Sequence, residues 1–137
     1  MARTFNLFIS HSWANSGHYD GLIKLLDQKT HFSYCNYSIP KDNPIHNAPH
    51  DDQLYEAIKR KISPCSVVLI LAGVYGSRSK WIDKEIRISK SEFQHPKSII
   101  AIMPWHAERT STKVKDSADK VVKWETSSIV NAIRELS

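Results

Sequence analysis

The sequence predicts an α/β fold in which a parallel sheet is covered by helices on both faces. Two short apolar runs, 65–72 and 98–103, are typical of strands buried on both sides. Segments of helical periodicity alternate with these and with other strand-like segments along the 137 residues. Such alternation demands right-handed crossovers between parallel strands, so helices must lie on both faces of the sheet. The length fits one domain, and we expect residues 1–137 to form it.

The first half of the chain predicts two strands and two helices. A β-rich strand is expected over 4–10 and an amphipathic helix over 18–29. A second strand, with alternating aromatic residues, is expected over 32–39. Three prolines exclude regular structure from 40–50, and a connection of about eleven residues is long enough to suggest a functional loop. A helix then begins at Asp51 or Asp52.

The second half continues the alternation, with strands that are more apolar than the first two. In order, we expect a strand over 65–72, a loop over 73–79, a helix over 80–93, a strand over 98–103, an irregular or weakly helical connection over 105–119, an edge-like strand over 120–124 and a helix over 126–136. This order favours a flavodoxin-like three-layer sandwich with five parallel strands in the order 2-1-3-4-5. Ligands of such sheets bind beyond the carboxyl ends of the strands, where strands one and three diverge. The loops 10–17, 40–50 and 73–80 should meet there.

Composition and charge narrow the function classes. The net charge is +5, but the basic residues are scattered and fit solvated helix faces, so nucleic acid is not expected as a partner. The sequence has no signal-like segment and no apolar run of about 18 residues, which predicts a cytoplasmic protein that does not span a membrane. Cys35 and Cys65 show no metal or redox spacing, and both are expected to be buried thiols.

One acidic residue breaks the pattern of the helix predicted at 80–93. With Trp81 placed at zero and about 100° per residue, Glu85 falls at about 40°, between Trp81 and Ile82 and inside the apolar arc. The other charged residues of this stretch lie on the opposite side: Asp83, Lys84 and Arg87. A carboxylate on the buried side is costly unless it is paired with a base or borders a polar cavity. Both interpretations stay open from the pattern alone.

Phe8-Ile9-Ser10 ends the first predicted strand, and Trp81-Ile82-Asp83-Lys84-Glu85-Ile86 lies near the start of the helix predicted at 80–93. These two motifs resemble the conserved boxes of TIR domains, namely the strand of the first box and the W-x-x-x-E helix. The strand at 67–71 and the apolar strand ending at Pro104 stand where that family has them. The resemblance covers nearly the whole chain in element order and is closest to small bacterial TIR-like proteins, including those of Thoeris-type antiphage defence.

The resemblance implies a function and a site. Members of the family that cleave NAD use the glutamate of the W-x-x-x-E helix, so Glu85 is the implied catalytic residue and NAD the substrate, with no separate cofactor. The expected product is a linear, cyclic or conjugated ADP-ribose-derived signal that acts on a downstream effector. Self-association through the loops is also expected. The substrate-binding candidates are Ser10, His11, Ser12, Trp13 and Trp81, and the candidates for the pocket rim are Tyr37, Lys41, His46 and His106. Family members often carry a basic or aromatic pair where this chain has His11 and Ser12.

Other functions are weighed against this one. A non-enzymatic TIR adaptor that self-associates would use the proline-rich loop 40–50. A phosphoreceiver would need carboxylates after strands one and three, and the chain has none there. A flavodoxin would hold FMN phosphate in a hydroxyl-rich first loop, which the segment 10–17 loosely fits. No metal is expected, because Pro49 prevents a helix that would align His46 with His50.

Overall fold

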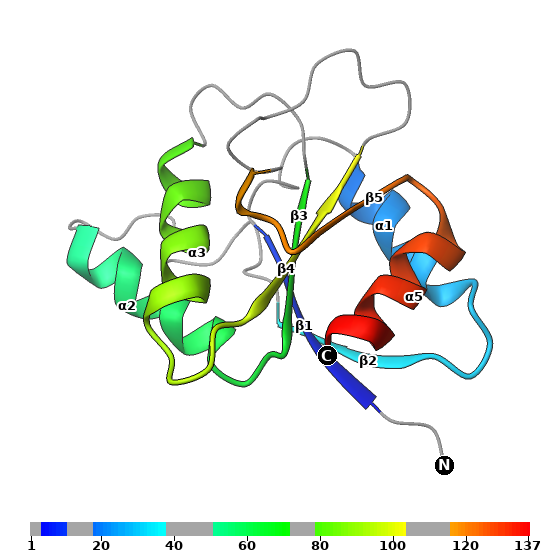
Figure 1. Cartoon of the computed structure of the whole chain (residues 1–137), viewed down its shortest axis with the longest axis horizontal. Coiled ribbons are helices and arrows are strands. Elements are labelled where there is room, and N and C mark those ends of the chain that lie inside the picture. The colour runs from blue at the N-terminus through cyan, green and yellow to red at the C-terminus, as the bar shows by residue number, and fades with distance from the viewer. Residues whose placement is uncertain (1–3, 11–17, 38–50, 72–78, 104–115) are drawn as a thin grey trace.

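The computed structural model describes residues 4–10, 18–37, 51–71, 79–103 and 116–137. Within these ranges five parallel strands form one sheet in the order β2-β1-β3-β4-β5, and four helices pack on it (Figure 1). The predicted α/β class and the flavodoxin-like strand order 2-1-3-4-5 are therefore confirmed. For residues 18–19, 51–54, 71 and 79–83 the structure describes the backbone.

The strands are close to their predicted positions. They are β1 (Thr4–Ile9), β2 (Ser33–Asn36), β3 (Val67–Leu71), β4 (Ser98–Ile102) and β5 (Lys120–Val122). β3 lies at the centre, where it pairs with β1 through Val67 opposite Leu7 and with β4 through Val67 opposite Ser98. β5 is the edge strand that the sequence predicts. It is two residues shorter than expected, because the N–H of Glu125 bonds the carbonyl of Lys123 at 2.9 Å and turns the chain.

The helices are α1 (His18–Asp27), α2 (Asp51–Ile62), α3 (Ser79–Ser91) and α5 (Thr126–Leu136). The bounds of α5 agree with the prediction, and α2 begins at Asp51 as expected. The prediction that α1 reaches residue 29 is wrong. The chain reverses at His31, whose φ of 60° is left-handed, so that it can enter β2. Arg134 of α5 lies beside this turn, with its Nη2 3.4 Å from the His31 carbonyl oxygen.

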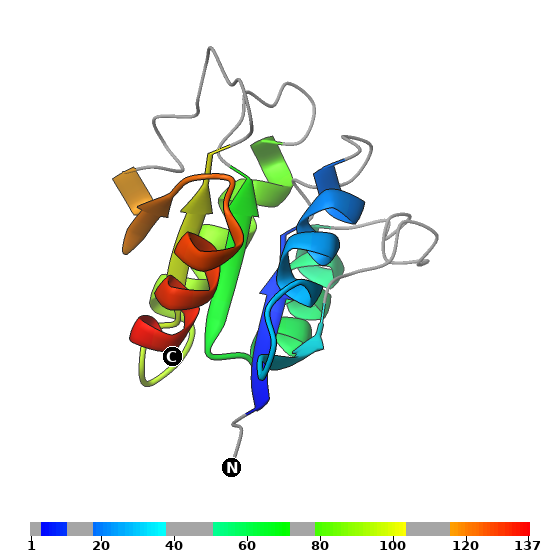
Figure 2. The same ribbon diagram turned by 90° about the vertical axis from the view of Figure 1, so that its right-hand side faces the viewer.

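Two apolar cores hold the three layers together. On one face, α1 and α5 cover alternate residues of the strands, and the fully buried residues there include Leu7, Ile9, Leu22, Leu69 and Ile129. On the other face, α2 and α3 cover the intervening residues, which include Phe8, Ile58, Val68, Ile88 and Ile99. Figure 2 shows the first pair of helices in front of the sheet, with β1, β3 and β4 running upward. We refer to these as the α1/α5 face and the α2/α3 face.

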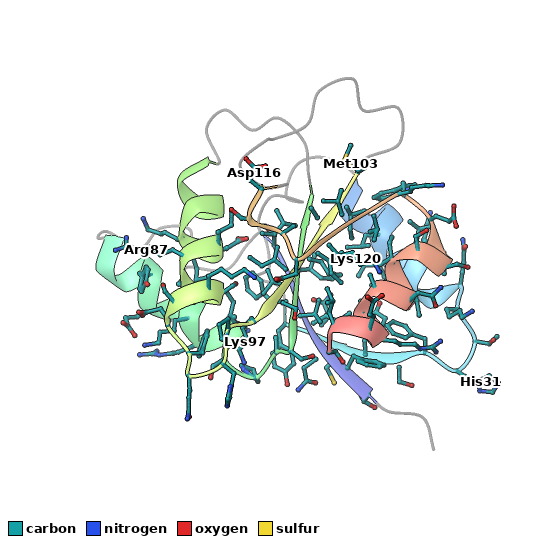
Figure 3. All side chains as sticks on the ribbon, in the orientation of Figure 1. His31, Arg87, Lys97, Met103, Asp116 and Lys120 are labelled. Carbon is teal, nitrogen blue, oxygen red and sulfur yellow. The ribbon has the colours of Figure 1, made fainter. Side chains whose placement is uncertain are left out.

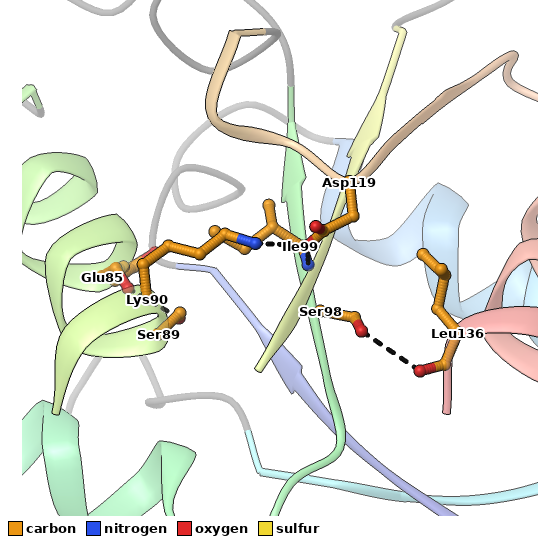
Figure 4. Close-up of polar contacts among 7 residues, drawn as sticks. All are labelled: Glu85, Ser89, Lys90, Ser98, Ile99, Asp119 and Leu136. Atoms are coloured by element: carbon orange, nitrogen blue, oxygen red, sulfur yellow. Dashed lines mark hydrogen bonds and ion pairs between the residues drawn. The ribbon is translucent and has the colours of Figure 1, made fainter. Parts of the chain in front are cut away.

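A polar cluster connects α3 to the far edge of the sheet. Asp119 stands just before β5, and its Oδ2 accepts hydrogen bonds from the N–H of Ile99, at 2.8 Å, and from Nζ of Lys90 (Figure 4). The N–H of Asp119 in turn donates to the carbonyl of Ile99 at 2.8 Å. Ser98 donates to the carbonyl of Leu136 at 3.1 Å and so attaches the end of α5 to β4.

The two cysteines differ in their surroundings. Cys65 is 1% exposed in the α2/α3 core, as predicted, and burial raises the pKa of its thiol to about 12. The prediction that Cys35 is also buried is wrong, because Cys35 is exposed. It lies on β2, a four-residue edge strand with three exposed side chains. An edge strand has a neighbour on one side alone, so strand-like sequence does not ensure burial there.

None of the helices within the described ranges is both long and apolar enough to cross a membrane.

Candidate functional site

Glu85 lies in the second turn of α3 on the side that faces the sheet. The buried residues described in α3 are Glu85, Ile88 and Ser89, which have the i, i+3, i+4 spacing of one helical face. The Glu85 side chain is 0% exposed. The sequence-based prediction that this carboxylate lies on the buried side is therefore confirmed. Taking a carboxylate out of water is costly, so this residue occupies a position where an apolar side chain would be cheaper.

The remaining charges on α3 follow the predicted arrangement in part. Arg87 is exposed and points away from the sheet, with its guanidinium carbon 5.9 Å from the centre of the Tyr55 ring on α2 (Figure 3). Lys84 is half-buried rather than fully solvated. A lysine can bury its methylene groups while its ammonium group reaches water, so this position is still compatible with the polar side of the helix.

Ser10 directly follows the carboxyl end of β1. It lies one residue beyond Ile9, which with Leu69 forms the last pair between β1 and β3. Its N–H donates to the carbonyl of Leu69 at 2.9 Å, and its side chain is 2% exposed. Side chains alternate along a strand, and Phe8 belongs to the α2/α3 core. The same alternation directs Ser10 to the α2/α3 face, which is the face that carries Glu85.

Tyr37 follows β2 and reaches the same layer. Its N–H donates to the carbonyl of Leu7 at 2.9 Å, which continues the ladder between β1 and β2 by one step. Its side chain is half-buried and packs against the α2/α3 core. The structure thus brings three sequence-predicted residues, Ser10, Tyr37 and Glu85, to one face of the sheet.

The other candidates are placed in part or not at all by the described ranges. The backbone of Trp81 lies in α3 one turn before Glu85. Outside the described residues lie His11, Ser12, Trp13, Lys41, His46 and His106. The loop 40–50 and its proposed role lie there too.

Sequence reasoning missed one buried polar residue, Ser89, which is 0% exposed. Its hydroxyl donates to the carbonyl of Glu85 at 2.7 Å, one turn earlier in the same helix (Figure 4). Its position four residues after Glu85 on the buried stripe was the signal that could have identified it. Because this hydroxyl is used within the helix, Ser89 offers little to a ligand.

Within the described part of the chain, no group of three or more His, Cys, Asp or Glu side chains could hold a metal ion. The arrangement there is instead a buried carboxylate on α3 and a buried serine that follows β1, both on the same face of the sheet. Such a group can accept hydrogen bonds from hydroxyls and stabilise positive charge, and both actions are stronger away from water.

Comparison with known families gives a match over most of this framework. Residues 8–109 match the model of the family described as "Thoeris protein ThsB, TIR-like domain". The matched range contains the end of β1, the whole of β3 and β4, and the helix α3 with Glu85. No curated protein matches the chain. The chain therefore belongs to the TIR-like domain family of the Thoeris protein ThsB, a family of TIR-type defence proteins.

Proposed function

We propose that the chain is an NAD-consuming TIR enzyme of antiphage defence, and that Glu85 is its catalytic carboxylate. The observation that carries this proposal is a carboxylate with 0% exposure on the helix of the W-x-x-x-E motif. Membership of a TIR-like defence family supports the proposed role in antiphage defence. The reaction is cleavage of the bond between nicotinamide and ribose, which gives an ADP-ribose-derived messenger for a separate effector.

The chemistry needs a negative group beside the ribose. Breaking the glycosidic bond develops positive charge on the anomeric carbon and the ring oxygen, as in glycoside hydrolysis. A carboxylate held there stabilises that charge and accepts hydrogen bonds from the ribose hydroxyls. Nicotinamide leaves as a neutral molecule and needs little help from an acid, so one carboxylate suffices. The product is linear, cyclic or conjugated according to which nucleophile attacks the anomeric carbon.

Other residues have supporting roles in this proposal. Ser10, with the backbone that follows it, would bind the pyrophosphate, and an aromatic ring from Trp13 or Trp81 would stack on a base. Tyr37 would border the pocket, together with Lys41, His46 and His106. Residues 1–137 would act as one domain in the cytoplasm, and association of copies through their loops would complete or activate the site.

The burial of Glu85 bears on this proposal in two ways. Exclusion of water strengthens the interaction between the carboxylate and a developing positive charge. The same burial means that NAD reaches the carboxylate after a rearrangement of the groups that cover it. An enzyme that is active when its partners or copies assemble would behave in this way.

The same observation favours a second candidate, a non-enzymatic TIR adaptor. A carboxylate that solvent does not reach can serve the fold alone, for example by bonding within the core. In that case the protein would act through self-association, and Glu85 would have no catalytic role.

One experiment separates the two candidates. The purified protein, alone and with extract of phage-infected cells, is incubated with NAD, and the products are identified by mass spectrometry. The enzyme proposal predicts free nicotinamide from the wild type and at least about 100-fold less from Glu85→Gln, because an oxyanion-hole donor or equivalent electrostatic group is worth that much. The matched control is Glu56→Gln, an exposed glutamate on α2, which should behave as the wild type. Absence of nicotinamide under every condition, or equal release by Glu85→Gln, would favour the adaptor.

A further inference from the structure

The helix that carries Glu85 also carries Lys90, whose side chain connects α3 to the sheet. Lys90 follows Glu85 by five residues, which corresponds to about 7.5 Å along the helix axis and about 140° around it. Since Glu85 faces the sheet, Lys90 lies away from the sheet on one flank of the helix. From there its Nζ forms an ion pair with Oδ2 of Asp119, and Figure 4 shows this contact crossing from α3 to the edge of the sheet.

Asp119 is itself fixed to the backbone of β4. Its Oδ2 accepts a hydrogen bond from the N–H of Ile99 at 2.8 Å, and its own N–H donates to the carbonyl of Ile99 at 2.8 Å. Two bonds to one strand residue leave the carboxylate little freedom. An ion pair between exposed side chains usually contributes little, because both long side chains must be ordered. Here one partner is ordered before the pair forms, so the contact ties α3 to the sheet itself.

Contacts with α2 restrain α3 from the side opposite to Asp119 (Figure 1). The guanidinium carbon of Arg87 lies 5.9 Å from the centre of the Tyr55 ring on α2. Just after the last residue of α3, Oε2 of Glu92 lies 3.5 Å from Nζ of Lys59 on α2. Rotation of α3 in one direction would break the contacts with α2, and rotation in the other would break the ion pair with Asp119. Together the two sides fix the angle at which α3 faces the sheet.

We propose that Lys90 and Asp119 are positioning residues for Glu85. The angle of α3 decides whether the Glu85 carboxylate faces the sheet, where it is 0% exposed, or turns toward solvent. The ion pair favours the first arrangement, so it raises the fraction of molecules whose carboxylate is placed to act on the ribose. The inference rests on the proposed function, because this placement affects turnover when Glu85 acts on a substrate. In this role neither Lys90 nor Asp119 touches NAD.

The strength of the ion pair limits the size of the effect. Its side chains are 33% and 38% exposed, and an exposed pair shifts an equilibrium by at most about fivefold. Lys90→Ala should therefore lower kcat for NAD cleavage about threefold to fivefold, after correction for the folded fraction measured by circular dichroism. KM for NAD should stay within about twofold of the wild type, because the lost contact affects Glu85 in the transition state and not the binding of NAD.

Three further variants make the test specific. Lys90→Arg keeps a cation that can bond the carboxylate and should recover most of the wild-type kcat. Lys120→Ala removes a comparable ion pair, between β5 and Glu135 of α5, and should leave kcat unaltered because that pair does not involve α3. Asp119→Asn retains an acceptor for the N–H of Ile99, so the double variant Lys90→Ala/Asp119→Asn should lose no more kcat than Lys90→Ala alone. Additive losses, or an equal loss in Lys120→Ala, would contradict the positioning role.

Chemical labelling of the Glu85 carboxylate gives a readout that does not depend on turnover. A water-soluble carbodiimide with glycine amide modifies carboxylates that solvent reaches, and peptide mass spectrometry measures the rate at each residue. Modification of Glu85 should be slow in the wild type, about threefold to fivefold faster in Lys90→Ala, and close to the wild-type rate in Lys90→Arg. Glu56, which is exposed on α2, is the internal reference and should react at the same rate in all three proteins.

The two readouts separate this inference from the proposed function. If the wild type releases no nicotinamide from NAD, the proposed function fails, and the labelling rate of Glu85 still decides whether the ion pair sets the angle of α3. An unchanged labelling rate of Glu85 in Lys90→Ala overturns the inference. In an active enzyme, an unchanged kcat of Lys90→Ala overturns it as well.

Discussion

The two faces of the sheet differ in where they place polar groups. The buried core described on the α1/α5 face is apolar throughout. The buried polar residues of the described ranges are Ser10, Glu85 and Ser89. The last two lie on α3, and strand alternation directs the first to that same α2/α3 face. Within the described ranges, the buried residues of the α1/α5 face are therefore apolar, whereas the α2/α3 face contains a fully buried carboxylate.

This asymmetry indicates that the α2/α3 face combines two tasks. Toward the amino edge of the sheet it is as apolar as its counterpart, with Cys65 and Ile62 fully enclosed. Toward the carboxyl edge it holds Glu85 at a cost in desolvation. Proteins depart from locally optimal sequence mainly at functional sites, and the carboxyl edge is where α/β sheets bind ligands.

The largest stability effect is expected on the apolar face. Ile133→Ala removes a side chain that is 0% exposed in α5 and should lower the free energy of unfolding by about 2–5 kcal/mol. Activity per folded molecule should stay as in the wild type, because Ile133 lies near the end of α5, away from the carboxyl edge. Urea denaturation together with kinetics at a temperature where both proteins are folded measures the two quantities. A changed KM for NAD would show that the α1/α5 face also affects substrate binding.

A second test asks whether the amino-edge half of the α2/α3 face is sealed. Burial raises the pKa of Cys65 from 9.0 to about 12, which lowers its thiolate fraction about 1,000-fold at pH 8. Native protein should therefore react rapidly with a thiol reagent at the exposed Cys35 alone, and unfolded protein at both cysteines.

The same raised pKa predicts how stability depends on pH. The folded protein keeps the Cys65 proton while the unfolded chain loses it above pH 9.0. The contribution to stability is thus complete below pH 9.0 and declines as the pH approaches 12. A Cys65→Ala variant should show a smaller decline over that range. Equal declines would mean that Cys65 is not sealed in the core.

An intermediate effect is expected where α3 meets the edge of the sheet. Asp119→Ala leaves the N–H of Ile99 without its acceptor and should cost about 1–3 kcal/mol. Lys90→Ala removes the ion pair alone, whose side chains are 33% and 38% exposed, and should cost less than about 1 kcal/mol. The difference between the two free energies of unfolding, obtained by denaturant titration, separates the hydrogen bond from the ion pair. Equal losses would show that the charge pair carries the whole contribution.

The smallest effect is expected at Ser89, although it is as buried as Glu85. Its hydroxyl bonds within α3, and Ser89→Ala exchanges that bond for better helix propensity. The free energy of unfolding should change by less than about 0.5 kcal/mol, and nicotinamide release should match the wild type. A large loss of activity would place the hydroxyl in the site and extend the polar region of this face.

Much of the framework was predictable because its signals are local. The bounds of α5 follow from its apolar spacing, and the burial of Glu85 follows from its angle on the helix of the W-x-x-x-E motif. The predictions that failed depend on tertiary neighbours. The early end of α1 follows from the left-handed turn at His31, and the exposure of Cys35 follows from the edge position of β2. The close approach of Trp124 to Gly21, where an added Cβ atom would lie 2.9 Å from Cζ2 of the indole, could not be predicted either, because the two residues are more than a hundred positions apart.

The most direct measurement is made on one variant, Glu85→Gln, which keeps the size of the side chain and removes its charge. We expect its free energy of unfolding to stay within about 1 kcal/mol of the wild type, while nicotinamide release from NAD is abolished. A loss of about 3–5 kcal/mol, the cost of breaking a buried ion pair, would contradict the account if turnover per folded molecule were retained. Glu85 would then hold the α2/α3 face together instead of acting on a substrate.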